Sequence, residues 1–127
     1  MSDKSIVQRL FLKPNYKVVL INAPVDYKSK LGELPPGLTI STKATGAVDL
    51  IQVFVSSMKE LKEQLEILKH LLRPNGLLWV TYPKGTSKIK ADLNRDTIVE
   101  YARSIGLQGV AVISIDDTWS ALRLKAI

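Results

Sequence analysis

The chain has 127 residues, of which 46% are hydrophobic and 24% are charged, and it therefore predicts one globular domain spanning residues 1–127. It contains no cysteine and one histidine, His70, so we expect no disulfide, no zinc or iron–sulfur site, no cysteine nucleophile and no Ser-His-Asp triad. These counts still allow a metal site with oxygen ligands, of the kind that magnesium occupies. No residue is nevertheless predicted to bind a metal.

The formal net charge of +6 favours anionic partners. The basic residues are dispersed along the chain, however, and the one local excess is formed by Lys84, Lys88 and Lys90. Because no aromatic residues alternate with these lysines, the pattern is more typical of a solvated loop than of a nucleic-acid-binding surface. We therefore do not expect nucleic acid as a partner.

The cellular location of the protein is predicted from its first residues and from the length of its apolar runs. Residues 1–14 carry neither a long apolar core nor a small-residue cleavage site, and no run approaches the roughly eighteen apolar residues of a membrane span. The sequence therefore predicts a cytoplasmic protein without membrane contact.

The first part of the chain predicts two short helices and two strands. A short helix is expected over residues 4–12, with one apolar side that covers the sheet. The residues on that side are Ile6, Val7, Leu10 and Phe11. The segments that follow predict a buried strand over 16–22, a short helix over 26–34, a short strand over 38–41 and a loop over 42–46.

Residues 47–84 predict a βαβ unit, in which a helix joins two parallel strands. The first strand, AVDLIQVFV, is a nearly continuous apolar run and is therefore expected to be covered on both faces. The helix, SSMKELKEQLEILKHLL, has one apolar face, its polar face includes His70, and Ser57 with Glu60 predicts a capping box at its start. Pro74-Asn75-Gly76 is expected to stop the helix and turn the chain into a strand over residues 77–82.

The last third of the chain predicts one helix and a β-hairpin. The helix is expected over residues 94–105, with Asn94 as its N-cap. An apolar strand is expected over 110–115 and a strand with alternating faces over 118–125, joined tightly at Asp116-Asp117. Trp79 and Trp119 are both interpreted as packing residues.

Strands that alternate with helices and close in an antiparallel hairpin predict a single three-layer α/β domain of Rossmann-like type, with a mostly parallel sheet of about six strands. The order of a central DLI strand, a helix, an LRPNG turn, another helix and a terminal hairpin resembles the class I methyltransferase fold. The resemblance implies a glycine-rich turn after the first strand and an acid after the second, for S-adenosylmethionine. Here Asn22-Ala23-Pro24-Val25-Asp26 and Thr42-Lys43 occupy those places, so we expect neither S-adenosylmethionine nor another cofactor.

Five peptides of the chain, INAPVDY, LGELPPG, LLWVTYPKG, DLNRD and IDDTWSALR, together resemble a bacterial family of small Rossmann-like proteins of unknown function. These peptides span nearly the whole chain. The resemblance supports the Rossmann-like fold and implies no particular activity.

Ligands of open α/β sheets bind at the carboxyl ends of the strands, near the point where the strand order reverses. For a methyltransferase-like order, that point lies between the first strand and the DLI strand. The segments that follow these two strands, residues 22–26 and 56–57, are then expected to face each other. Tyr82 and Lys84 are expected beside them. The hairpin turn at Asp116-Asp117 lies at the same edge if the strand before it is parallel to the others. The candidate ligand-binding residues are Asn22, Asp26, Ser56, Ser57, Tyr82, Lys84, Asp116 and Asp117.

Most of these candidates also have a purely structural interpretation. Asn22 is expected to cap the strand exit, Ser57 to cap the helix and Lys84 to be solvated. Adjacent aspartates such as Asp116 and Asp117 usually satisfy their own turn. The acidic and basic residues at the start of the last helix, Asp92, Arg95 and Asp96, are expected to pair locally.

Two functions are favoured by the residues alone, and a third, nucleic-acid binding, would require a continuous basic face. A complete α/β core with an altered cofactor turn favours a non-catalytic binding or regulatory module that acts through a partner protein or by self-association. The alternative is a protein or enzyme that binds a small anionic metabolite at the carboxyl edge, including a divergent methyltransferase, with Lys84, Ser56, Ser57 and Asn22 as anchors. The sequence does not decide whether the protein is an enzyme.

Overall fold

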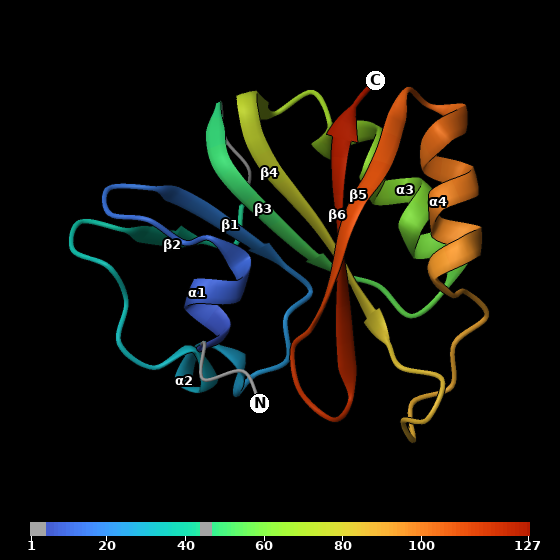
Figure 1. The fold of residues 1–127 in the computed structure, drawn as a ribbon, viewed down its shortest axis with the longest axis horizontal. Helices are drawn as coiled ribbons and strands as arrows, with labels where there is room; N and C mark the ends of the chain where they lie inside the picture. The colour runs from blue at the N-terminus through green and yellow to red at the C-terminus, as the bar shows by residue number, and fades with distance from the viewer. Residues whose placement is uncertain (1–4, 44–46) are drawn as a thin grey trace.

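A computed structural model describes residues 5–43 and 47–127, and within them it contains four helices and six strands (Figure 1). In chain order these are α1 (Ile6–Leu10), β1 (Lys17–Ile21), α2 (Tyr27–Leu31), β2 (Thr39–Ser41), β3 (Val48–Phe54), α3 (Met58–Leu68), β4 (Leu72–Pro83), α4 (Arg95–Ser104), β5 (Leu107–Ser114) and β6 (Trp119–Ala126). Lys4, the expected start of the first helix, and residues 44–46 of the expected loop lie outside the described residues.

The six strands form one mixed sheet in the order β2-β1-β3-β4-β6-β5. The pairs β1–β2, β1–β3 and β3–β4 are parallel, whereas β6 is antiparallel to both β4 and β5. This arrangement confirms the α/β class and the closing antiparallel hairpin. The strand order reverses between β1 and β3, so the carboxyl ends of these two strands border the crevice in which α/β proteins usually hold ligands.

Helices cover both faces of the sheet, as the three-layer prediction requires. On one face, α3 and α4 bury Leu61, Leu65 and Ile98 against β3, β4 and β6. On the other face, α1 and α2 bury Leu10 and Tyr27 against the same strands. Strand β3 lies between these two layers, and all but one of its residues are buried, because neither of its faces meets solvent.

The predicted alternation of residues in the last strand is confirmed. Leu122 and Leu124 belong to the core under α3 and α4, whereas Ala121 belongs to the core under α1 and α2 and the partly buried Trp119 packs against that core. Trp79 of β4 is also fully buried in this second core. Its indole N–H donates a 3.1 Å hydrogen bond to the backbone carbonyl of Leu10, which ties the end of α1 to the middle of the sheet.

The prediction for the segment after α3 was wrong in its boundaries. The helix ends at Leu68, four residues before the expected Leu72, and β4 already begins at Leu72. Leu72 pairs with Val48 across a register shift, and Asn75 takes a positive φ of 66°, so the Pro74-Asn75-Gly76 segment is part of an irregular strand rather than a helix stop. His70 is consequently an exposed turn residue and does not lie on the helix.

Phe11 is more exposed than the sequence predicts, and the apolar strand β5 is also partly exposed. Phe11 adopts a left-handed backbone conformation at the end of α1 and is 44% exposed, with the Arg123 guanidinium 5.5 Å from the centre of its ring. Val110 and Val112 of β5 are 39% and 45% exposed, because β5 is an edge strand of the sheet. The apolar composition of β5 therefore does not reflect burial.

No helix in the described part of the chain has the length and apolar character needed to cross a bilayer.

Candidate functional site

The carboxyl ends of β1, β3, β4 and β5 meet at one edge of the sheet. The first three strands are parallel, and β5 runs in the same direction because both β4 and β5 are antiparallel to β6. Every candidate residue of the sequence analysis lies at or just after one of these ends. The structure thus places the candidates on one edge, but it pairs them in ways that the sequence did not indicate.

After β1, the chain turns sharply at Asn22, whose φ is 59°. This left-handed conformation is tolerated by asparagine and glycine far better than by other residues, so Asn22 performs the backbone role of a glycine while retaining a side chain. The turn borders a cavity of about 490 Å³, lined also by Pro24, Lys28 and Thr42.

Asp26 follows β1 and Asp116 follows β5, and the side chain of one lysine, Lys30, contacts both carboxylates. The Lys30 ammonium of α2 lies 3.7 Å from the Asp26 carboxylate and 3.5 Å from that of Asp116. Both pairs are partly exposed, so each contributes little to stability by itself. Their consequence is positional, because they hold α2 next to the β5–β6 turn.

Asp116 is also the organising residue of that turn. Its Oδ1 accepts hydrogen bonds from the backbone N–H groups of Thr118, at 2.8 Å, and Trp119, at 2.9 Å. Although partial burial acts to raise the pKa of Asp116, these two bonds and the nearby Lys30 outweigh it and lower the pKa below its ordinary value. Asp117 is exposed and takes no part in this arrangement.

Ser56 and Ser57 lie at the N-terminus of α3, where the capping differs from the predicted box. Ser57 Oγ accepts from the Glu60 N–H at 3.2 Å, as expected of an N-cap. The Glu60 carboxylate, however, accepts from the N–H of Ser56, at 3.1 Å, instead of that of Ser57, and also from the Ser56 hydroxyl at 2.9 Å. The N–H of Met58 donates to the Asp92 carboxylate at 2.7 Å.

The positive end of α3 is thus already matched to two carboxylates of the protein. Asp92 was expected to pair locally at the start of α4, and that expectation was wrong, because it caps a helix 34 residues earlier in the chain. A ligand anion at this helix end has to displace Asp92 or Glu60. Ser56 and Ser57 are therefore structural residues of the helix start.

Tyr82 and Lys84 border a second cavity, between the end of β4 and the loop of residues 84–94. The cavity encloses about 440 Å³, and we refer to it as the β4-loop cavity. Burial raises the pKa of Tyr82, an effect that the nearby Arg95 opposes. Lys84 is not a freely solvated side chain, since its ammonium donates a 2.7 Å hydrogen bond to the Ser114 hydroxyl.

One group of buried polar residues was missed by the sequence analysis. The Tyr27 hydroxyl donates to Gln52 Oε1 at 2.9 Å, and Gln52 Nε2 donates to the Thr81 hydroxyl at 2.9 Å. Gln52 and Thr81 are fully buried, and burial raises the pKa of Tyr27 well above its ordinary value. The available signal was Gln52 itself, a polar residue in the middle of an otherwise apolar strand run.

Comparison with solved structures identifies the architecture. The mitomycin 7-O-methyltransferase MmcR superimposes with a TM-score of 0.70 at 8% identity, over 88% of this chain and 49% of that one. A SAM-dependent methyltransferase from Aquifex aeolicus gives a TM-score of 0.65 at 14% identity, over 96% and 88% of the two chains. This chain has a methyltransferase-like fold.

A third match has a similar extent. A TehB-like SAM-dependent methyltransferase from Corynebacterium glutamicum gives a TM-score of 0.59 at 12% identity, over 99% of this chain and 90% of that one. The chain thus spans about half of MmcR and most of the other two proteins. At these identities the similarity concerns the fold alone. No family model and no curated protein sequence matches the chain.

Within residues 5–43 and 47–127, no three His, Cys, Asp or Glu side chains are grouped closely enough to hold a metal ion.

Proposed function

We propose that this protein is a non-catalytic binding module that acts by self-association and does not use S-adenosylmethionine. The proposal that the module is non-catalytic is supported by one observation: the polar groups at the carboxyl edge of the sheet are paired with other groups of the protein. Asp116 is bonded within its own turn and to Lys30, and the α3 N-terminus is bonded to Asp92 and Glu60. Groups that stabilise the fold in this way are poorly placed to act as general bases or nucleophiles, which need free access to a substrate.

The residues at the ends of β1 and β2 do not fit S-adenosylmethionine. Asn22 supplies the sharp turn after β1, but its side chain and Pro24 stand where a glycine turn lets a cofactor approach the backbone. At the end of β2, the Ser41 hydroxyl accepts from the backbone N–H of Lys43, and no carboxylate follows the strand in residues 42–43 to bind a ribose. We derive no reaction step through this cofactor.

The surface that favours self-association lies along β5. Figure 1 shows β2 and β5 at the two ends of the sheet, and β5 has eight residues whereas β2 has three. Ile115 donates its N–H to the Trp119 carbonyl, and the antiparallel ladder alternates from there, so the backbone groups of Val112 point away from β6. An apolar edge strand with outward-pointing donors and acceptors is a template for pairing with another strand.

One end of this edge is already closed by the chain itself. The carbonyl of Ser114 accepts a hydrogen bond from the Arg9 guanidinium of α1. A bulge interrupts the ladder between Gly109 and Ala111. The stretch available for pairing is therefore short and centred on Val112, and the contact has to be extended by neighbouring elements.

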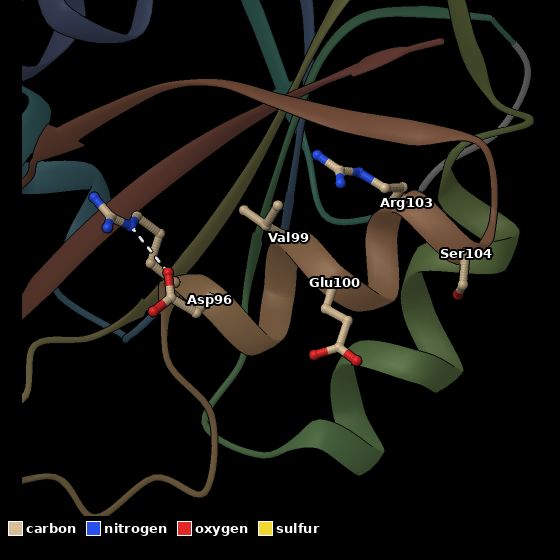
Figure 2. Close-up of a pocket in the computed structure, with 6 residues that line it drawn as sticks. Asp96, Val99, Glu100, Arg103 and Ser104 are labelled. Atoms are coloured by element: carbon tan, nitrogen blue, oxygen red, sulfur yellow. Dashed lines mark ion pairs between the residues drawn. The ribbon is translucent and has the colours of Figure 1, made fainter.

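Helix α4 provides that extension, through a hollow of about 590 Å³ along its outer side. Figure 2 shows Val99 and Arg103 directed toward β5, whereas Glu100 points toward α3. The first turn of the helix carries Asp96, whose carboxylate lies 3.6 Å from the Arg95 guanidinium, and the last turn carries Arg103.

These charges favour a second copy of the chain as the partner. If two β5 strands pair antiparallel about a two-fold axis, the two α4 helices also run antiparallel. The first turn of one helix then faces the last turn of the other, which places Asp96 opposite Arg103 twice in the same interface. Val112 and Val99 would lie near the centre of such a contact.

The molar mass in solution tests this proposal. We expect the protein to approach twice its 14.1 kDa chain mass as its concentration rises in sedimentation equilibrium. Val112→Lys places a charge at the centre of the strand pairing, so we expect this variant to remain monomeric. Val25→Lys is the matched control, since Val25 is fully exposed in the loop before α2 and belongs to neither β5 nor α4.

Two results contradict the proposal. The first is a wild-type protein that stays monomeric throughout the concentration series, and the second is a Val112→Lys variant that associates as strongly as Val25→Lys. Circular dichroism of both variants ensures that unfolding is not mistaken for dissociation. The separate statement on the cofactor fails if calorimetry detects S-adenosylmethionine binding at micromolar affinity.

A second function, the binding of a small anionic ligand, is favoured by the β4-loop cavity. Of the anchors expected for it, Ser56 and Ser57 are engaged by Glu60, and only Lys84 lines that cavity. The two functions are compatible, because the cavity and the β5 edge are formed by different residues.

A further inference from the structure

The β4-loop cavity contains a buried polar atom without a partner. The Ser87 hydroxyl oxygen is shielded from solvent and makes no hydrogen bond in the described part of the chain. Leaving a buried polar group unpaired costs about 1–3 kcal/mol, so native proteins rarely retain one without a reason. The loop nevertheless holds Ser87 in place, because its backbone N–H donates to the Lys84 carbonyl at 2.9 Å.

The polar lining of the cavity is cationic or neutral. Lys84 and Lys90 both line it, and no carboxylate among residues 5–43 and 47–127 does. The one acidic residue of the adjoining segment, Asp92, is directed away to the N–H of Met58. An ammonium group has three N–H donors, and Lys84 uses one on Ser114, so two remain for another acceptor.

The rest of the lining is apolar. Tyr82 and Leu93 are 8% and 6% exposed, and Ile89 adds a further apolar side chain at the rim. A cavity with apolar walls and a few converging polar groups is the usual form of a small-molecule site. Its volume of about 440 Å³ suits a molecule of modest size.

We propose that the β4-loop cavity binds a small organic anion, that is, a phosphate or carboxylate group joined to a compact apolar body. Lys84 and Lys90 neutralise the anionic group, and the Ser87 hydroxyl donates a hydrogen bond to it. Tyr82 and Leu93 contact the apolar body. This inference rests on the second function proposed above and assigns its site.

Three simple probes test the assignment by ¹H–¹⁵N NMR titration of the whole chain. Phenyl phosphate carries both parts of the ligand, inorganic phosphate carries only the anionic group, and phenol carries only the apolar ring. We expect phenyl phosphate to shift the amide signals of residues 84–94 in a saturable way. Inorganic phosphate should shift the same signals with weaker affinity, and phenol should produce no saturable shift.

Variants distinguish a specific site from general attraction to a basic loop. Lys84→Ala is expected to weaken phenyl phosphate binding about tenfold, the size of one charge-assisted hydrogen bond. Lys88→Ala, which removes the same charge from the same loop but not from the cavity lining, should weaken it less than about twofold. Ser114→Ala frees the Lys84 ammonium without removing it and should leave binding intact.

Ser87→Ala separates a ligand contact from a structural role. The hydroxyl has no partner among the residues that the structure describes, so this variant should keep the melting temperature of the wild type and still bind phenyl phosphate more weakly. A large fall in melting temperature would indicate that the hydroxyl is satisfied within the free protein and would overturn its assignment.

The titration also separates this inference from the function on which it rests. Saturable shifts confined to residues 22–28 would place the anion at the other cavity and overturn the site assigned here, while leaving anion binding as a function. Equal losses of affinity in Lys84→Ala and Lys88→Ala would mean that the anion is attracted only by the overall positive charge of the loop, and would overturn the assignment of the site to the β4-loop cavity. The absence of saturable shifts anywhere would remove both the site and the function.

Discussion

The hydroxyl of Tyr27 on α2 donates a 2.9 Å hydrogen bond to Oε1 of Gln52, a fully buried residue in the central strand β3. Around this bond, Tyr27 packs edge-on against Phe54, with ring centres 4.7 Å apart, and Phe54 packs in the same way against Trp119 at 5.1 Å. The short helix α2 is thus attached to the central strand β3 by a hydrogen bond that lies inside an aromatic cluster.

Replacing Tyr27 with phenylalanine leaves Gln52 Oε1 buried without a donor. We expect the free energy of unfolding to fall by about 1–3 kcal/mol, measured by urea denaturation. Tyr16→Phe removes a hydroxyl from a partly exposed ring outside this hydrogen-bond chain and should change stability by less than about 0.5 kcal/mol. Equal effects of the two substitutions would show that the Tyr27–Gln52 bond contributes nothing.

The same bond predicts coupling between the two residues. Gln52→Met removes the polar group that Tyr27 satisfies, so a chain with both Tyr27→Phe and Gln52→Met should lose less stability than the sum of the two single losses. Additive losses would contradict this expectation.

Asp116 is expected to make stability depend on pH in the acidic range. Its pKa is lower in the folded chain than the ordinary value of 3.8, so its ionised form stabilises the fold above about pH 4. This contribution is lost as the pH falls through the folded-state pKa. Asp116→Asn should therefore be less stable than the wild type near neutral pH, by about 1 kcal/mol, and the difference should shrink progressively below about pH 4.

Asp117→Asn is the matched control for that experiment, since it removes the same charge from the adjacent, exposed residue. Its unfolding free energy should follow the wild type over the whole pH range. If Asp116→Asn also follows the wild type, then neither the two turn hydrogen bonds nor Lys30 stabilises the ionised carboxylate.

Asp92 is expected to stabilise α3 although it belongs to the loop before α4. Its carboxylate accepts the Met58 N–H at 2.7 Å, at the positive end of the helix, so Asp92→Ala should cost about 0.5–2 kcal/mol in thermal or urea unfolding. Asp96→Ala, an exposed substitution in the first turn of α4, should cost less than about 0.5 kcal/mol. If Asp92→Ala costs no more than Asp96→Ala, the hydrogen bond between Asp92 and the Met58 N–H does not stabilise α3.

Several local predictions were confirmed because they depend on residues close together in the chain. Asn94 caps α4 by accepting the Thr97 N–H at 3.0 Å, and Ser57 caps α3. The apolar run of β3 is buried on both faces, and the Asp116-Asp117 turn closes a β-hairpin. In each case a short pattern of apolar or capping residues carries the information.

The errors came from segments whose environment is set by distant parts of the chain. The apolar strand expected over residues 110–115 begins three residues earlier, at Leu107, where it pairs with Ala126 of β6. The region around Asn75 reads as a helix stop, yet Leu72 already pairs with Val48, so the strand begins before it. Strand order and register depend on tertiary contacts, and no local pattern specifies them.

The sequence by itself determined the α/β class, the approximate elements and the edge of the sheet at which the candidate residues gather, because hydrophobic period and turn chemistry act over a few neighbouring residues. Only the tertiary structure decided what those candidates bond to. Lys30 joins Asp26 to Asp116, Lys84 binds Ser114, and Asp92 caps a helix 34 residues earlier in the chain. The physical reason is that two side chains interact only when they are close in space, and residues far apart in the sequence become close only when the helices and the sheet pack together.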